Sequence, residues 1–120
     1  MHYYDELAVY ERKGFRVVVD KTWEDIHPRD CFDDGCYDIE DMCRQIDRGD
    51  LDWFMLRVRV FIDDLELAAE YLGGMMYERA SDCLTDGSAE DLIEQAVYSA
   101  QQRIPTLVER LSKIMVDTIA

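Results

Sequence analysis

Hydrophobic and polar residues alternate most regularly between positions 53 and 72, where the pattern predicts a β-hairpin. In a first strand over residues 53–62, the even positions from 54 to 62 are apolar, whereas Arg57 and Arg59 lie on the opposite face. A two-residue turn at Asp63 and Asp64 returns the chain through a second strand over residues 65–72. The register that follows sets Ile62 opposite Leu65, Val60 opposite Leu67, Val58 opposite Ala69, Leu56 opposite Tyr71 and Arg57 opposite Glu70, with Glu66 diagonal to Arg59.

A third strand is predicted over residues 15–20, FRVVVD, because its odd positions form one apolar face. The preceding residues 3–13 fit two structures, a short helix that ends at Gly14 or a strand that pairs with 15–20. Their periodicity does not decide between the two. The Gly73-Gly74 pair either ends the last strand or allows a bulge before residues 75–77.

Residues 38–48 are predicted to form a helix after a loop over 21–37. Asp38 is a typical N-cap residue, and Gly49 can close the C-terminus of the helix. The apolar positions follow the spacing i, i+3, i+4, i+7, and they are Ile39, Met42, Cys43 and Ile46. This spacing places the Cys43 thiol on the buried face of the helix and turns its acidic residues toward water.

The last third of the chain is predicted to be helical over residues 89–118, after a possible capping box at 88–91, SAED. Hydrophobic positions recur there at steps of four and three, and they are Ile93, Val97, Ala100, Ile104, Leu107, Leu111, Ile114 and Thr118. A straight helix of this length would measure about 45 Å, against roughly 30 Å for the width of a small domain. Pro105 is therefore expected to kink or split the helix, which packs on the sheet. A straight helix would instead protrude and dimerise through this apolar seam.

These elements predict a single α+β domain over residues 1–120. Its small antiparallel sheet consists of the strands 15–20, 53–62 and 65–72. The helices 38–48 and 89–118 are expected to cover one face of that sheet.

The charge balance narrows the function classes. With 27 acidic and 13 basic residues the net charge is −14, which argues against direct binding to nucleic acid or to an anionic membrane. A cationic partner fits this balance, and so does high solubility with no further role. The chain shows neither a signal-peptide pattern nor an apolar run long enough to span a membrane, so we expect it in the cytoplasm of a bacterial host cell, with its four cysteines reduced.

Two sets of residues in the sequence partly match known metal-binding patterns. Positions 1, 5, 6, 9 and 12 of a calcium-binding EF-hand loop match Asp30, Asp34, Gly35, Asp38 and Asp41. Phe32 breaks this pattern at position 3, and the last ligand is Asp where Glu is usual. A zinc site would use His27, Cys31, Cys36 and Cys43, which lack the close C-x-x-C pairing typical of zinc ligands. No metal and no cofactor is therefore expected, and the cysteines are interpreted as packing residues.

The acidic surface is the stronger candidate. Residues 20–52 contain twelve acids and four bases, a net charge of −8. A rigid array of carboxylates resembles the phosphate charge of duplex DNA and can occupy a cationic groove. We expect exposed Trp23, Phe32 and Tyr37 to add apolar contacts. The predicted partner-binding residues are Asp33, Asp34, Asp38, Glu40, Asp41, Asp47, Asp50 and Asp52. The familiar sequence motifs of hydrolases and nucleotide-binding enzymes are absent, so no catalytic residue is predicted.

Residues 27–34, HPRDCFDD, and 47–78, DRGDLDWFMLRVRVFIDDLELAAEYLGGMMYE, resemble small proteins of phages, prophages and plasmids that have no assigned activity. The resemblance covers about half the chain and implies a mobile-element context, without site residues. By analogy of charge and size, we expect a non-enzymatic protein that inhibits a host nucleic-acid-binding defence enzyme. The alternatives are a homodimeric structural or host-takeover protein, and then a metal-binding protein or hydrolase.

Overall fold

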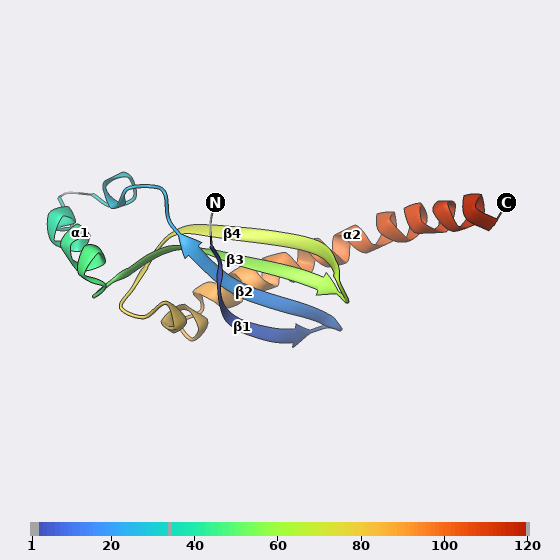
Figure 1. Ribbon diagram of the computed structural model, residues 1–120, viewed down its shortest axis with the longest axis horizontal. Helices are drawn as coiled ribbons and strands as arrows, with labels where there is room; N and C mark the ends of the chain where they lie inside the picture. The colour runs from blue at the N-terminus through green and yellow to red at the C-terminus, as the bar shows by residue number, and fades with distance from the viewer. Residues whose placement is uncertain (1–2, 34, 120) are drawn as a thin grey trace.

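Four antiparallel strands form one sheet in the order β1-β2-β3-β4, so each strand pairs with the next along the chain (Figure 1). The computed structural model describes residues 3–33 and 35–119. The strands are β1 Asp5–Arg12, β2 Phe15–Trp23, β3 Asp52–Ile62 and β4 Leu65–Tyr77, and the main helices are α1 Ile39–Arg48 and α2 Ser88–Ile119. The α+β class and the three predicted strands are confirmed, and each strand extends beyond its predicted bounds.

Within residues 3–13, for which the sequence left helix and strand open, Asp5–Arg12 form β1. A tight turn at Lys13 and Gly14 joins β1 to β2, and both residues have positive φ, 51° and 84°. Two-residue turns with positive φ at both positions match the right-handed twist of hairpin strands. The turn therefore favours strand pairing over a helix that ends at Gly14.

The predicted register of the β3–β4 hairpin is correct at its turn and wrong beyond it. Ile62 pairs with Leu65 as predicted, but the register shifts after Phe61, so that Val60 lies opposite Ala68. Leu67 is the extra residue of this bulge, and it is fully buried. All later pairs move by one position: Val58 lies opposite Glu70, Leu56 opposite Leu72 and Arg57 opposite Tyr71.

The Gly73-Gly74 pair does not end β4. The strand continues to Tyr77 through a second bulge, since Phe54 pairs with Met75 and Leu56 with Leu72. Gly74 has a φ of 68°, which favours glycine. The bulge alternative of the sequence analysis is therefore the correct one.

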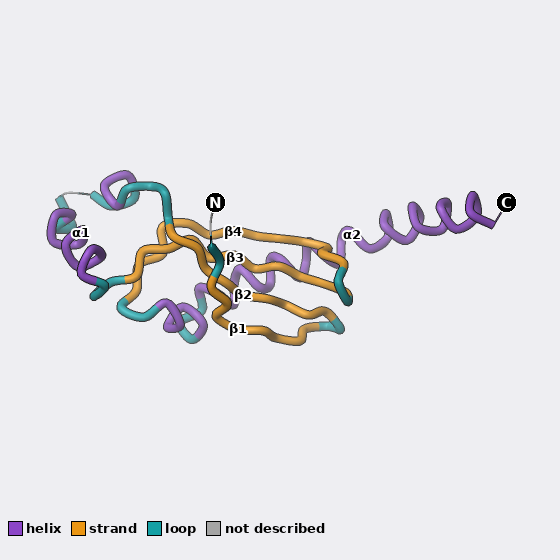
Figure 2. Tube along the Cα trace, viewed as in Figure 1, coloured by secondary structure: helices purple, strands orange, loops and turns teal. Residues whose placement is uncertain are grey.

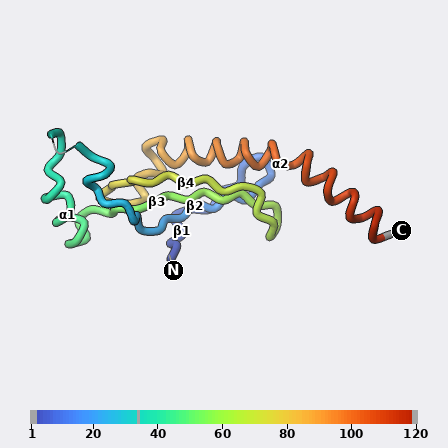
Figure 3. The backbone as a smooth tube through the Cα atoms, turned by 90° about the horizontal axis from the view of Figure 1, so that it is seen from above, coloured from blue at the N-terminus to red at the C-terminus, as the bar shows by residue number. Residues whose placement is uncertain are grey.

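The core lies between one face of the sheet and the first half of α2, which runs along that face (Figure 3). From the sheet it takes Phe15, Val17, Val19, Phe54, Leu56, Val58, Val60, Leu67 and Met75. From α2 it takes Ala89, Leu92, Ile93, Ala96, Val97 and Ala100. Three alanines on this helix face permit close approach to the strands, and the larger side chains fill the space on either side.

The second half of α2 extends away from the sheet, and the molecule measures 66 × 24 × 24 Å (Figures 1 and 3). The helix is continuous over its 32 residues and changes direction about midway, with Pro105 inside it. Proline removes one backbone hydrogen bond and bends a helix. The helix does not end there when the turns on either side keep their own hydrogen bonds. The kinked form is thus observed, and the protrusion expected only of a straight helix is present as well.

The predicted capping box at the start of α2 does not form. The Asp86 carboxylate accepts a hydrogen bond from the Ser88 amide, at 2.9 Å. The Ser88 hydroxyl instead lies 3.0 Å from the Tyr77 hydroxyl, which also donates to Asp86. The first turn of α2 is therefore held by a side chain from β4, which local sequence spacing does not reveal.

The position predicted for α1 is wrong, although its bounds are correct. The Asp38 carboxylate caps its first turn by accepting from the Asp41 amide at 3.1 Å, and Gly49 ends it with a φ of 82°. The helix lies beyond the end of the sheet (Figure 1), and of its residues only Ile39 is buried. Because α2 already covers the apolar face, the segment between β2 and β3 folds beside the strand ends.

Candidate interaction surface: the acidic lobe

Residues 24–51 form a separate projection between β2 and β3, which we call the acidic lobe. It contains a short 3₁₀ helix, Pro28–Asp30, then α1 and the connecting loops, and no strand within its described residues (Figure 2). Its ten acidic and three basic residues amount to a net charge of −7, half of the −14 of the whole chain. Half of the excess charge is thus carried by less than a quarter of the residues.

Two hydrogen bonds tie the base of the lobe to the sheet. The Trp53 indole donates to the Ile26 carbonyl at 2.9 Å, and the Gly74 amide donates to the Glu24 carboxylate at 2.8 Å. A Cβ at position 73 would lie 2.6 Å from the same carboxylate, so any larger residue there would force the Glu24 side chain to shift. The second bulge of β4 therefore also serves to anchor the lobe.

The lobe has few buried residues, and contacts between aromatic rings hold its loop against the end of the sheet. The Phe32 ring lies 5.0 Å from the Tyr37 ring and 5.9 Å from the Trp53 ring, centroid to centroid. Phe32 is half-buried by these contacts, so its predicted exposure is wrong in part. Tyr37 is 47 % exposed and Trp23, at the end of β2, is 74 % exposed. Two of the three predicted apolar contacts are therefore available at the surface.

The eight predicted partner-binding acids fall into different environments. Asp33 and Asp38 accept hydrogen bonds from nearby backbone amides but remain exposed. Glu40 and Asp47 are exposed on α1 and have no ion pair or hydrogen bond among the described residues. These four carboxylates, which we call the acidic set, are those of the eight that remain exposed without an ion pair among the described residues.

The other four predicted acids contribute less. Asp41 pairs with Arg44 at 3.4 Å and also accepts from Gln45, and Asp50 pairs with Arg48 at 3.1 Å. Asp52 lies on β3 and forms an ion pair with Lys21, so it belongs to the sheet. Asp34 lies outside the described residues. Local neutralisation thus leaves a smaller acidic surface than the sequence predicts.

Asp20 was counted with the acidic surface, and this is wrong. It is 3 % exposed on β2, where its carboxylate accepts from Arg57 at 2.8 and 2.7 Å and from Arg59 at 3.2 Å. The Asp20 hydrogen bonds raise the pKa of the Arg57 guanidinium, and the Tyr4 ring stacks on it at 3.4 Å. The predicted Arg57–Glu70 pair is absent, and Glu70 accepts instead from the Ser99 hydroxyl at 3.0 Å.

This ion pair lies on the sheet face opposite α2 and was missed by the sequence analysis. The bidentate geometry is the stronger form of an arginine–carboxylate contact. The sequence did contain one indication of it, since Asp20 of β2 and Arg57 and Arg59 of β3 carry opposite charges and lie on the polar faces of their strands. It was not usable without the register between these strands, which are separated in sequence by the whole lobe.

The cysteines only partly follow the prediction that they are packing residues. Cys83 is fully buried, and burial raises the pKa of its thiol to about 11. Cys31 and Cys36 are exposed, which contradicts the prediction for these two thiols. Cys43 is half-buried, with its sulfur 3.7 Å from the His27 ring.

Neither of the two metal patterns gathers a ligand set in the described residues. No group of three or more His, Cys, Asp or Glu side chains converges anywhere in residues 3–33 and 35–119. Among the calcium-loop positions, the Asp38 side chain accepts a hydrogen bond from the Asp41 amide in the first turn of α1. Asp34 lies outside the described residues. The zinc pattern is divided, since Cys36 lies near Asp33 at 3.9 Å and Cys43 near His27.

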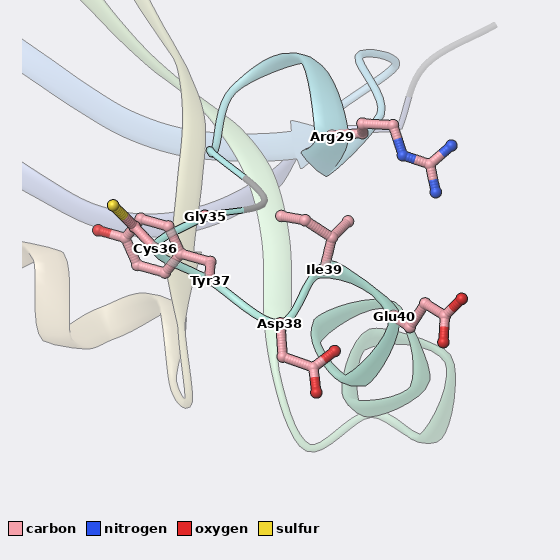
Figure 4. A pocket seen from close by; sticks show the side chains of 7 residues that line it. All are labelled: Arg29, Gly35, Cys36, Tyr37, Asp38, Ile39 and Glu40. Atoms are coloured by element: carbon pink, nitrogen blue, oxygen red, sulfur yellow. The ribbon is translucent and has the colours of Figure 1, made fainter.

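An open depression in the lobe separates its two short helices (Figure 4). Its lining residues are Arg29, Gly35, Cys36, Tyr37, Asp38, Ile39 and Glu40. In Figure 4 the Arg29 and Glu40 side chains lie on one side of it, and Cys36 and Tyr37 lie on the other. The mixture of one base, two acids and an exposed aromatic ring suits a protein surface better than an enclosed small-molecule site.

Comparison with known protein families, curated proteins and solved structures finds no match. In the described part of the chain, no helix has the length and apolar character needed to cross a membrane. The arrangement of the lobe is therefore the basis on which function is inferred.

Proposed function

We propose that this protein is a non-enzymatic interaction protein whose acidic lobe binds a cationic surface of a partner protein. The observation that carries the proposal is the concentration of charge. The lobe holds −7 of the −14 net charge, and Asp33, Asp38, Glu40 and Asp47 expose their carboxylates on a projection that extends from the end of the sheet.

Charge and apolar area have different roles in such binding. The field of the lobe speeds encounter with a cationic surface, and screening limits its reach to about 8 Å at physiological salt. Affinity comes mainly from contacts that exclude water. Trp23 and Tyr37 supply exposed aromatic area at the base and in the loop of the lobe. The proposal therefore combines these two rings with the acidic set.

We further propose that the partner is a nucleic-acid-binding enzyme that the lobe blocks. A groove that binds DNA is lined by Lys and Arg spaced to meet roughly one phosphate charge per 1.7 Å of duplex axis. Clustered carboxylates are attracted to the same groove and exclude the nucleic acid from it. The resemblance of residues 27–34 and 47–78 to phage, prophage and plasmid proteins adds a setting in which such inhibition is useful.

The test compares two variants of equal net charge. The lobe variant, D33N/D38N/E40Q/D47N, removes the acidic set but keeps side-chain acceptors for the Gly35 and Asp41 amides, because Asn also accepts at positions 33 and 38. The control variant, E11Q/D63N/D64N/E78Q, removes four exposed acids outside the lobe. Each tagged protein is used to capture basic, DNA-binding proteins from a bacterial lysate, with and without competing duplex DNA.

We expect the wild type and the control variant to retain the same partner, and duplex DNA or high salt to release it. The lobe variant should bind this partner at least about tenfold more weakly, since four exposed charges at a few tenths of a kcal/mol each account for such a factor. Equal retention by the lobe variant would refute the proposal. Release by salt but not by DNA would refute the nucleic-acid-binding identity of the partner alone.

A further inference from the structure

The distal half of α2, residues 105–119, has an apolar stripe that no other part of the described chain covers from Val108 onward. Val108, Leu111, Ile114 and Met115 are 55, 48, 60 and 62 % exposed. On a helix of 3.6 residues per turn these four side chains fall on one side, together with Thr118 and with Leu107, which is half-buried against the core. Isolated helices of about 12–15 residues are marginally stable in water, so this half requires a partner to gain stability from packing.

The charges of the distal half are unusual for this chain. Two acids and two bases give it no net charge, whereas the whole protein carries −14. Glu109 and Lys113 pair with each other at 3.7 Å on the side away from the stripe. Arg110 and Asp117 flank the stripe on one edge, two turns apart, and neither has an ion pair or hydrogen bond among the described residues.

We propose that the distal halves of two copies of this chain pack together as antiparallel helices. The register is set by the stripe: Leu111 of one copy packs against Ile114 of the other, and Leu107 packs against Thr118. The same register brings Val108 against Met115 along one edge. Along the other edge it brings Arg110 of each copy opposite Asp117 of the other. The dimer thus contains two ion pairs between residues that are unpaired in the single chain.

A parallel arrangement lacks this complementarity. It would set Arg110 beside Met115 of the second copy, a charge against an apolar side chain. It would also place the two acidic bodies side by side. In the antiparallel form the bodies lie at opposite ends of a segment about 22 Å long, more than two screening lengths at physiological salt.

The sheet offers an apolar ledge where the helix of the second copy ends. Ile62 and Leu65, on either side of the β3–β4 turn, are exposed to 42 and 46 %. This end of the sheet adjoins the middle of α2, because the Arg103 guanidinium donates to the Leu67 carbonyl at 3.1 Å. The ledge therefore lies near the start of the distal half, where the C-terminal end of the second helix arrives in this register.

Lipid is the other occupant that an exposed apolar helix suggests, and the charges of this helix argue against it. Helices that lie in a membrane surface carry many Lys and Arg residues on their polar face. Here Arg110 and Lys113 are balanced by Glu109 and Asp117. A second copy, which supplies the missing charge partners, fits these residues better.

The test is sedimentation of the full chain over a wide concentration range. The wild type should pass from 14.1 kDa toward twice that mass as concentration rises. Asp117→Arg places two bases opposite each other at both ends and should weaken association at least about tenfold. Glu109→Arg makes the same charge change on the far side of the helix and should leave association near the wild-type value.

The exchanged double variant, R110D/D117R, restores both opposite-charge pairs in the antiparallel register and should recover association. Circular dichroism confirms that each variant is folded. A wild type that stays at 14.1 kDa throughout, equal weakening by Glu109→Arg, or an exchanged variant that stays weak would each overturn the proposal. Monomers that sediment with phosphatidylcholine vesicles would overturn it as well, in favour of lipid. None of these outcomes involves the acidic lobe, so this proposal and the proposed function stand or fall separately.

Discussion

The proximal half of α2, residues 88–104, and its distal half share one hydrophobic spacing but have different surroundings. Ile93, Val97 and Ala100 are buried against the sheet, whereas Leu111 and Ile114, which continue the same seam, are about half exposed. The strands end where the helix passes its midpoint. A periodic apolar face thus identifies a surface suited to burial, and the rest of the fold decides what covers it.

The largest expected effect comes from truncating one leucine in each half. Leu92→Ala should lower the free energy of unfolding by about 2–5 kcal/mol, because Leu92 is buried and its loss leaves a cavity. Leu111→Ala in dilute, monomeric solution should change it by less than about 0.5 kcal/mol. Urea unfolding followed by circular dichroism measures both values. Comparable losses for the two variants would show that the distal half is packed on the body of the same chain.

A smaller effect is expected from the residue that divides the two halves. Pro105→Ala returns a backbone donor to the helix interior and should stabilise the distal half by about 1–3 kcal/mol. Hydrogen exchange of amides 106–119 measures this as roughly ten- to a hundredfold slower exchange. Amides 92–100 serve as the internal control, since their protection comes from packing on the sheet. Unchanged exchange in the distal half would indicate that the kink carries no strain.

The smallest effect concerns the anchor at the start of the proximal half. Tyr77→Phe removes a hydroxyl that contacts Asp86 and Ser88 and should cost about 1 kcal/mol at neutral pH. Tyr98→Phe is the matched control, because Tyr98 is exposed on α2 and has no hydrogen bond among the described residues.

The pH dependence of this anchor has a definite sign. Burial, and then the hydrogen bond to Asp86, raise the pKa of Tyr77 above its ordinary value of 10. The stability from the hydroxyl is therefore complete below pH 10 and is lost as the pH rises through the raised pKa. The difference in unfolding free energy between wild type and Tyr77→Phe should shrink over that range. A difference that stays constant, or that grows with pH, would contradict the assigned contacts.

Local features of the chain were predicted well and long-range ones were not. The β3–β4 turn and the cap at Asp38 depend on residues next to each other in sequence, and both are confirmed. The bulge at Leu67 was missed because it depends on burial of that side chain beneath α2. The Asp20–Arg57 pair was missed because it joins strands on either side of the lobe. Of the candidate site, the sequence predicted the exposed carboxylates, but it did not predict that Arg44 and Arg48 pair with Asp41 and Asp50.

By itself, the sequence determined the α+β class, three of the four strands, the bounds of α1 and the charge excess of residues 24–51. These follow from periodicity, turn residues and composition, which act over a few neighbouring residues. Only the tertiary structure decided that α1 lies beyond the sheet, that Asp20 is a buried ion-pair partner, and that half of the α2 seam remains uncovered. Those outcomes depend on which helix packs against the one apolar face of the sheet, and on how far along the helix that face extends.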